Sequence, residues 1–160
     1  MASRRADDWS AAPFVPESRE LDVLAEAPVN CTGYPLHVDT TQTMFGAGSA
    51  DATIILVGEQ PGDREDRAGQ PFVGPAGRVL QECLDDAGIV RDGTYTTNAV
   101  KHFQHERRGS SRLHRRPTTA EVDACHPWLD AELAAVPDAT TVVALGATAA
   151  RGLLGTSVPI

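Results

Sequence analysis

The sequence contains no apolar run long enough to cross a membrane. A membrane-spanning helix needs about 20 predominantly apolar residues, and no stretch of the 160 residues approaches that length. Two arginines near the N-terminus are not followed by an apolar segment, so we expect no secretory signal. We therefore expect a cytoplasmic protein. A content of 41% hydrophobic residues is ordinary for a globular chain of this length, so we expect one compact domain.

Cysteine is scarce, with Cys31, Cys83 and Cys125 far apart in the sequence. An odd, sparse set in a cytosolic chain argues against a disulfide framework. The cysteines are then either reduced thiols or ligands of a metal centre. Cys83 falls on the apolar face of a helix expected over residues 77–87, where a core position is the simpler interpretation.

The common nucleotide-binding loops are also absent. An apolar stretch at 53–57 runs into GEQPGDRED, whose glycines and proline predict a tight turn after a strand. A P-loop requires Gly-Lys-Ser/Thr before its helix, but this loop has no lysine, and no G-x-G-x-x-G occurs. Four acids between Glu59 and Asp66 would repel a nucleotide phosphate. We therefore exclude an NTPase, and these carboxylates need another explanation.

The net charge of −8 hides a basic segment between residues 101 and 116. It holds one acid, Glu106, and three histidines, at positions 102, 105 and 114. Its six basic residues are Lys101, Arg107, Arg108, Arg112, Arg115 and Arg116. Such a local excess is typical of a phosphate-contacting patch. A solvated charged loop is the alternative.

Short apolar runs alternate with helical patterns along the chain. Strands are expected at 53–57, which should be buried on both faces, at 94–100 and at 140–145, which should also be buried, and helices at 77–87, 118–135 and 147–154. Thr118 or Thr119 is the expected N-cap of the second helix. This alternation predicts an α/β fold, a three-layer α/β/α sandwich around a mostly parallel sheet.

Outside these elements we expect little regular structure. Residues 1–28 should form a flexible segment with one short helix at 17–27, which leaves 29–160 as the domain. Residues 29–50 and 101–117 are expected to be irregular. The chain stops where a further strand should begin, so we expect the C-terminal part of the fold to be missing.

Ligands of open α/β sheets bind beyond the carboxyl ends of the strands. That rule brings together the GEQPGDRED loop, Asn98 and the turn at Gly146. Phe72, which stands in a proline-flanked loop, can present its ring to a flat ligand, and the Asn98 amide offers both a donor and an acceptor to a nucleobase edge. The alternative is that Phe72 anchors the core and Asn98 is a turn residue.

These residues carry a resemblance to a known family. The motifs GEQPGDRED, GQPFVGPAG, YTTNAVKHF and the RLH of the basic segment resemble the uracil-DNA glycosylase superfamily over about residues 31–155. They look most like the iron–sulfur family 4 enzymes and, in that neighbourhood, the UdgX type. The resemblance implies excision of uracil from DNA, preferably single-stranded. We expect a monomer. The family's His-Pro-Ser motif near the C-terminus has no counterpart here, which again suggests a truncated chain.

The resemblance also implies a role for each motif residue. The catalytic residues would be Glu59, Gln60, Asp63, Asp66 and His114. The uracil-binding residues would be Gly58, Phe72 and Asn98. The contacts to DNA phosphates would come from Arg107, Arg108, Arg112 and Arg115.

Physical chemistry agrees with these implied roles. Cleavage of an N-glycosidic bond passes through an oxocarbenium-like state that carboxylates can stabilise, so the acids of the loop would face a positive sugar. In UdgX-type proteins the histidine matched by His114 attacks the sugar and leaves a covalent DNA adduct, and a largely neutral imidazole suits that task. An ordinary hydrolytic family 4 glycosylase and a degenerate DNA-binding relative are the alternatives. His114 would then be a phosphate contact or merely exposed.

A [4Fe–4S] cluster is the cofactor that the resemblance implies. Cys31, His102 and Cys125 match three of its four ligand positions, but Tyr34 stands at the fourth, and tyrosine is a poor ligand for such a cluster. His37, three residues further on, is a remote substitute. Either the cluster is held by three residues and an exogenous ligand, or it is lost.

Overall fold

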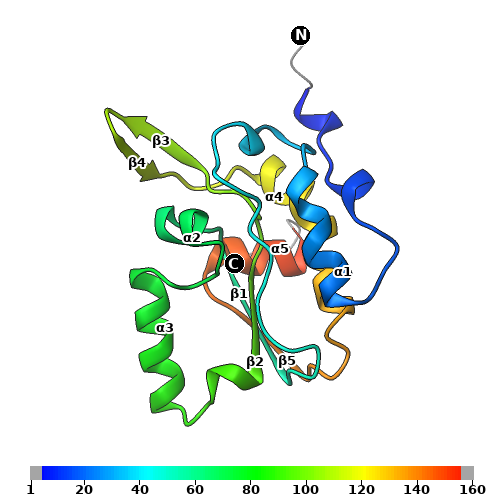
Figure 1. Ribbon diagram of the computed structural model, residues 1–160, viewed down its shortest axis with the longest axis vertical. Helices are drawn as coiled ribbons and strands as arrows, with labels where there is room; N and C mark the ends of the chain where they lie inside the picture. Colours follow the sequence, from blue (N-terminus) through cyan, green and yellow to red (C-terminus); the bar gives the residue numbers. More distant parts are fainter. Residues whose placement is uncertain (1–4, 156–160) are drawn as a thin grey trace.

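A parallel three-stranded sheet forms the centre of the computed structural model, which describes residues 5–155 (Figure 1). Its strands lie in the order β2-β1-β5 and comprise Ile54–Gly58 (β1), Thr94–Asn98 (β2) and Thr141–Ala144 (β5). Gly58 pairs with Asn98, and Val57 pairs with Ala144, so the three carboxyl ends meet at one edge. The α/β fold with a parallel sheet is confirmed.

Helices cover both faces of this sheet. They are α3 (Pro75–Asp86) on one face, and α4 (Thr119–Ala134) and α5 (Ala147–Leu154) on the other. Because successive side chains of a strand point to opposite faces, Val57 shares a core cluster with Leu129 of α4, while Leu56 packs with Leu80 of α3. Among the described residues no helix is long and apolar enough to span a membrane.

The start of α4 follows the sequence closely. Thr118 is its N-cap, and its hydroxyl accepts a hydrogen bond from the backbone N–H of Glu121 at 3.3 Å. The Glu121 carboxylate in turn accepts from the Thr118 N–H at 2.7 Å. This reciprocal capping box satisfies two N–H groups that a helix start otherwise leaves without partners.

The N-terminal segment packs onto α4, although its composition suggests flexibility. Ala11 and Leu24 are fully buried, and the Ala11 N–H donates to the Ala124 carbonyl at 2.7 Å. The small Ala11 side chain permits this close approach to the helix. Residues 1–4 lie outside the described part. The elements of this region are η1 (Ala6–Asp8), η2 (Ala12–Phe14), α1 (Leu21–Glu26), η3 (Ala27–Asn30) and η4 (Pro35–Val38).

Two regular elements occupy segments that the sequence suggests are irregular. The acidic loop winds into helix α2 (Asp63–Ala68), which Gly69 ends in the left-handed conformation. The basic segment forms an antiparallel hairpin of β3 (His105–Arg108) and β4 (Ser111–His114), which projects from the body (Figure 1). A short 3-10 turn, η5 (Arg91–Gly93), precedes β2.

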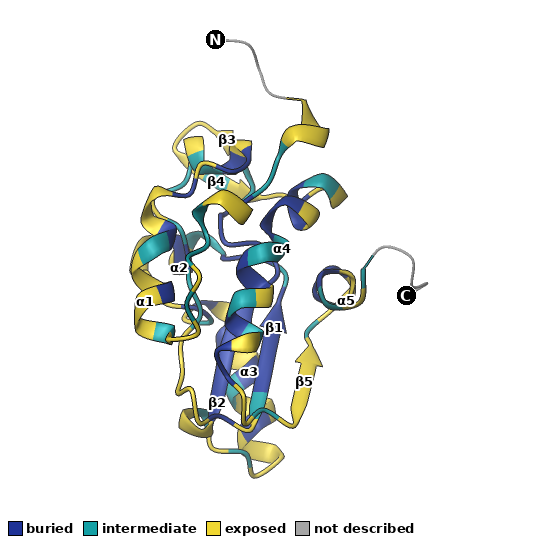
Figure 2. Cartoon of the chain, turned by 90° about the vertical axis from the view of Figure 1, so that its right-hand side faces the viewer, coloured by how far each residue is buried: buried dark blue, intermediate teal, exposed yellow. Residues whose placement is uncertain are grey.

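The expected burial of β5 and of one helix face is wrong. Every residue of β5 is exposed, with Val142 at 44%, whereas β2 at the other edge of the sheet is buried throughout (Figure 2). On α3, Leu80 and Leu84 are buried towards the sheet, but Val79 and Cys83 are exposed. Cys83 is therefore not a core residue.

Candidate active site at the carboxyl end of the sheet

A cavity of about 610 Å³ opens where the carboxyl ends of the strands meet α3 and the hairpin. Polar groups from β1, β2, α2 and β4 line it together with an apolar wall from α3. Its lining includes most of the motif residues singled out in the sequence, namely Gly58, Glu59, Gln60, Phe72, Asn98 and His114. Asp63 and Asp66 are not among the lining residues.

The floor of the cavity joins Gly58, Asn98 and Phe72. A β-carbon on Gly58 would lie 2.4 Å from Asn98 Oδ1 and 2.7 Å from Phe72 Cζ, so only glycine leaves room for both side chains. Asn98 is 4% exposed, and no described residue hydrogen-bonds its side-chain amide. Its donor and acceptor groups are thus free at the cavity floor.

Phe72 holds a backbone conformation that side chains rarely adopt. It is the one described residue other than glycine with a positive φ, at 56°. Arg91 Nη2 donates to the Phe72 carbonyl at 3.2 Å and to the Pro71 carbonyl at 3.4 Å. A β-carbon on Gly77 would collide with the Phe72 carbonyl. Strain of this kind persists only where the surroundings fix it, and it is frequent at ligand sites.

Glu59 lies at the centre of a polar group on the wall of the cavity. Its Oε1 is 3.3 Å from Nε2 of His114, whose side chain is 54% exposed. Its Oε2 accepts a hydrogen bond from the hydroxyl of Thr148, at the start of α5. Arg116 Nε donates to the same hydroxyl at 3.0 Å and lies 3.7 Å from Glu59 Oε2. The carboxylate is therefore fixed from two sides and faces His114 on the third.

Gln60 fastens the base of the hairpin. Its side-chain oxygen accepts from the Gln104 N–H at 2.9 Å. Its Nε2 donates to the carbonyls of Gln104 and Arg115, at 3.1 and 3.0 Å. These residues directly flank the two hairpin strands, so the buried Gln60 amide ties the element that carries His114 to the end of β1.

Arg112 is placed differently from the other arginines of the hairpin. Its side chain is 6% exposed and lies over the Phe103 ring, 5.3 Å from the centroid. Its Nε and Nη1 donate to Asp63 and Asp66 of α2, each at 2.6 Å. Its Nη2 is buried without a hydrogen-bond partner among the described residues. Arg112 thus faces α2 and not a DNA phosphate, and its two aspartates bind an arginine and not a sugar.

The pKa values of this group follow from the pairing. Hydrogen bonds from Arg67 and Arg112 lower the pKa of Asp63, against a smaller opposing effect of burial. The two aspartates raise the pKa of Arg112 despite its burial. Asp66 also accepts the Thr41 N–H at 3.1 Å, which joins the segment before β1 to the same group.

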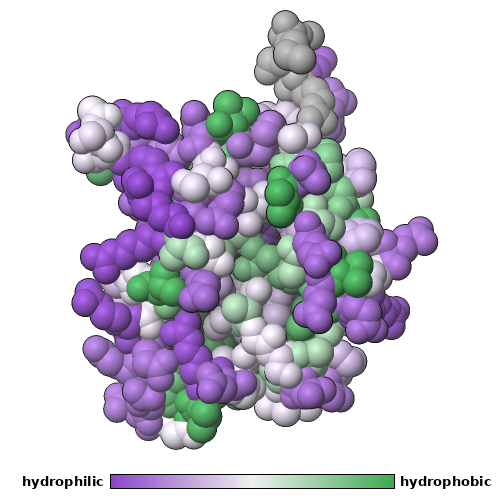
Figure 3. Space-filling model, in the orientation of Figure 1, coloured by the Kyte–Doolittle hydropathy of each residue, from purple (hydrophilic) through white to green (hydrophobic). Residues whose placement is uncertain are grey.

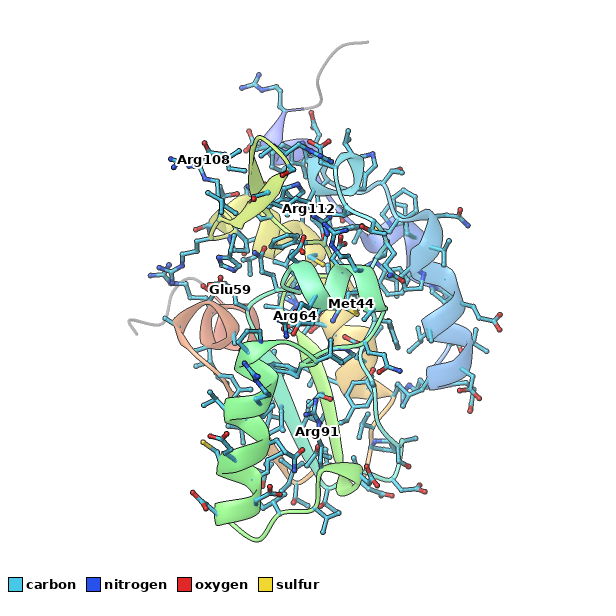
Figure 4. All side chains as sticks on the ribbon, turned by 60° about the vertical axis from the view of Figure 1, so that its left-hand side comes forward. Met44, Glu59, Arg64, Arg91, Arg108 and Arg112 are labelled. Carbon is cyan, nitrogen blue, oxygen red and sulfur yellow. The ribbon has the colours of Figure 1, made fainter. Side chains whose placement is uncertain are left out.

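The remaining arginines of the basic segment lie at the surface. Arg107, Arg108 and Arg115 are exposed, and Arg115 pairs with Glu106 at 3.6 Å. Figure 4 shows Arg108 at the outer end of the hairpin, whereas Arg112 lies above α2. The projecting hairpin is hydrophilic in the space-filling view (Figure 3). Its outer surface can approach a phosphate backbone next to the cavity.

The sequence profile of the uracil DNA glycosylase superfamily matches residues 45–158. The chain belongs to that superfamily. A type-4 uracil-DNA glycosylase of Thermotoga maritima is 40% identical over 130 residues, which are 81% of this chain and 63% of that protein. One of Pyrobaculum aerophilum is 35% identical over 135 residues, 84% of this chain and 65% of that protein. A type-5 uracil-DNA glycosylase of Thermus thermophilus is 32% identical over 123 residues. The chain thus spans less than two thirds of the length of these relatives.

The four positions expected to bind a cluster lie together in the core, where the N-terminal region, the loop after β2 and α4 meet. Cys31, Tyr34, His102 and Cys125 are all at most 2% exposed. The Tyr34 hydroxyl donates to Cys125 Sγ at 3.1 Å and lies 2.7 Å from His102 Nδ1. Burial raises the pKa of Cys125 to about 11 and lowers that of His102 to about 4. The donor set does not fit a [4Fe–4S] cluster, because the Tyr34 phenol stands at the fourth ligand position, where a third thiolate would be needed, and already bonds two of the other ligands.

Four residues of the candidate site had no role assigned to them from the sequence. Glu65 lines the cavity and accepts the Gly74 N–H at 2.7 Å, and Thr148 and Arg116 hold Glu59. Phe103 lies beneath the hairpin, with its ring centroid 6.3 Å from that of His114 and 4.9 Å from that of His105. Glu65 and Arg116 had appeared only in the charge counts of their segments, and Phe103 left a signal as the aromatic residue beside His102 in a strongly basic segment.

Proposed function

We propose that this chain excises uracil from DNA, preferably single-stranded, and that His114 captures the deoxyribose left behind. One observation carries the proposal. His114 Nε2 lies 3.3 Å from Glu59 at the rim of a cavity whose floor combines a ring and a free amide. A single-stranded substrate is favoured because the base must leave its stack, which costs a few kcal/mol and least where no partner strand is present.

The flipped base would enter between Phe72 and α3. The Phe72 ring offers a stacking face, and the free Asn98 amide can donate to one atom of the uracil edge and accept from its neighbour. Val79, exposed on α3, supplies apolar contact on the opposite wall. Such a pocket combines a mostly apolar surface with few polar groups that fix orientation.

Glu59 would assist bond cleavage by its charge. When the bond between C1′ and uracil N1 breaks, its electron pair leaves with uracil, and positive charge develops on the sugar. The Glu59 carboxylate is held by Thr148 and Arg116, so it does not have to reorganise as that charge appears. A preoriented charge of this kind is an effective way to stabilise a transition state.

The same arrangement allows His114 to trap the cation. In the tautomer with its proton on Nδ1, the Nε2 lone pair forms a bond to C1′ and the ring becomes an imidazolium. The neutral imidazole and the sugar cation thereby give a product with one positive charge on the imidazolium. The Glu59 carboxylate forms an ion pair with this charge. The half-exposed ring has room to turn from Glu59 towards the sugar. Water in place of the imidazole would give ordinary hydrolysis.

Denaturing electrophoresis tests the proposal. The protein is mixed with single-stranded DNA that contains one uracil, with thymine DNA as the control. We expect a uracil-dependent band that survives SDS and heat. His114→Ser should abolish this band, whereas His105→Ser should retain it, because His105 faces His114 across the same hairpin without bonding Glu59.

The other outcomes distinguish the alternatives. DNA that breaks under alkali without a covalent band would identify a hydrolytic glycosylase in which water replaces His114. An undiminished band in His114→Ser would remove His114 from the nucleophilic role. Retardation in a native gel, without uracil release, would identify a DNA-binding relative.

A further inference from the structure

At the expected cluster site, hydrogen bonds of the Tyr34 hydroxyl join His102 and Cys125. We propose that Tyr34 replaces the iron–sulfur cluster in this protein, with its hydroxyl bridging His102 and Cys125 in a metal-free buried core. The inference concerns the cofactor and the support of the hairpin, and it does not depend on uracil excision.

The Tyr34 hydroxyl, both ring nitrogens of His102 and Cys125 Sγ each take part in at least one hydrogen bond. The Tyr34 hydroxyl donates to Cys125 Sγ at 3.1 Å, so its oxygen accepts the proton of His102 Nδ1 at 2.7 Å. The neutral ring then accepts at Nε2 from the Thr43 hydroxyl, 3.0 Å away. This assignment of the tautomer follows from the hydrogen bonds. Both ring nitrogens of His102 are therefore occupied, and neither is left to bind iron.

The Tyr34 side chain also fills the space that a cluster would need. Its ring packs edge-on against His102, with the centroids 5.1 Å apart, and Tyr34 is 1% exposed. A cluster held by His102 and Cys125 would have to displace the Tyr34 hydroxyl, which bonds both of these side chains. Cys31 has a separate partner, the indole N–H of Trp128 at 3.3 Å. Among residues 5–155, no three His, Cys, Asp or Glu side chains are grouped to hold a metal ion.

The bridge joins three segments that are distant in sequence. Tyr34 belongs to the N-terminal region, His102 to the loop after β2, and Cys125 to α4. The Lys101 N–H also donates to Cys125 Sγ, at 3.3 Å, which fixes the same loop a second time. That loop leads directly into β3, so Tyr34 supports the base of the hairpin that carries His114.

Iron analysis is the first test. Each protein is purified anaerobically and reconstituted with iron and sulfide, and bound iron and visible absorbance are measured. We expect the wild-type protein to bind no iron and to stay colourless. Tyr34→Cys, which adds a third thiol beside Cys31 and Cys125 and removes the phenol, should bind iron and gain the broad visible absorbance of a cluster. Cys83→Ser in the Tyr34→Cys background is the control and should keep this gain, because Cys83 is distant and exposed.

Stoichiometric iron in the wild-type protein would overturn the inference. A Tyr34→Cys variant that binds none would show that Tyr34 is not what excludes the cluster, and would also overturn it. Tyr34→Phe tests the bridge itself, since it keeps the ring but leaves His102 and Cys125 without their shared partner. We expect its Tm to fall by several degrees, and an unchanged Tm would contradict the bridge. None of these readouts requires DNA, so failure here is separate from failure of the proposed glycosylase activity.

Discussion

Single residues shape the cavity by the atoms they lack as well as by those they supply. Gly58 lacks the β-carbon that would meet Asn98 and Phe72 at once. In Gly58→Ala we expect either the amide or the ring to move by about 1 Å, and displacements of that size cost about 100-fold in rate. Single-turnover release of uracil measures the effect.

The control for this substitution is Gly93→Ala. No atom lies within 4 Å of the added methyl group there, and the backbone of Gly93 suits any residue. We expect Gly93→Ala to excise uracil at the wild-type rate and both variants to keep their fold by circular dichroism. A Gly58→Ala variant as fast as the Gly93→Ala control would refute the close contact at the cavity floor.

At the scale of elements, the arginines of the hairpin separate into two kinds. Arg112 joins β4 to α2, and in Arg112→Met the fully buried Asp66 loses its charged partner, which costs about 3–5 kcal/mol of unfolding free energy. Arg108 is exposed, and Arg108→Ala should reduce the salt dependence of DNA binding by about one phosphate contact. Urea denaturation and binding titrations at several salt concentrations measure both variants.

These two variants serve as controls for each other. Arg108→Ala should leave the unfolding free energy within about 0.5 kcal/mol of wild type, as surface substitutions usually do. If Arg112→Met proved as stable as wild type but bound DNA with a smaller salt dependence, Arg112 would be a phosphate contact after all.

The same link between α2 and the hairpin predicts a pH dependence. Arg67 and Arg112 lower the pKa of Asp63 in the folded state, below the value of about 3.9 typical of unfolded chains. The unfolded chain then binds more protons in acid, so this contribution to stability is present above about pH 4 and is lost as the pH falls further. We expect Tm to fall less steeply between pH 5 and 3 in Asp63→Asn than in wild type. Parallel curves would contradict this. Asp51→Asn, at an exposed position before β1, is the control.

Elements with local signals were predictable from the sequence, and those that depend on distant partners were not. Thr118 and Glu121 form a capping box within four residues, so the start of α4 could be read directly. The hairpin strands contain charged residues on both faces, and only the Gly109-Ser110 turn indicated them. The pairing of Arg112 with Asp63 and Asp66 spans 49 and 46 residues, and no local pattern reports such a contact.

The candidate site shows the same division. The rule that strand ends converge correctly brought Gly58 and Asn98 together, since both are the last residues of paired parallel strands. It did not indicate that the Gln60 amide would form its hydrogen bonds with backbone groups of Gln104 and Arg115. That outcome depends on the path of the hairpin, which the polar sequence of β3 and β4 leaves open.

At the scale of the whole molecule, a buried ion pair joins segments from three parts of the chain. Lys101 and Glu132 pair at 0% and 1% side-chain exposure. Lys101 Nζ also donates to the Asn98 carbonyl at 2.8 Å. Glu132 accepts from the Tyr95 hydroxyl at 2.9 Å and the Gly46 N–H at 2.8 Å. Because every donor and acceptor around the pair is satisfied, the network fixes β2 and its Asn98 relative to α4.

Removing one charge of this pair should cost far more than removing both. Glu132→Gln leaves the Lys101 ammonium buried without a counter-charge, and we expect a loss of about 3–5 kcal/mol in urea denaturation. Lys101→Met combined with Glu132→Leu leaves no buried charge, so the double variant should recover part of that loss. Asp130→Asn, on the same helix, removes only the exposed partner of His126 and should cost less than about 1 kcal/mol. If Glu132→Gln cost no more than Asp130→Asn, the pair would be hydrated in solution, and the position of Asn98 would have to rest on the strand pairing alone.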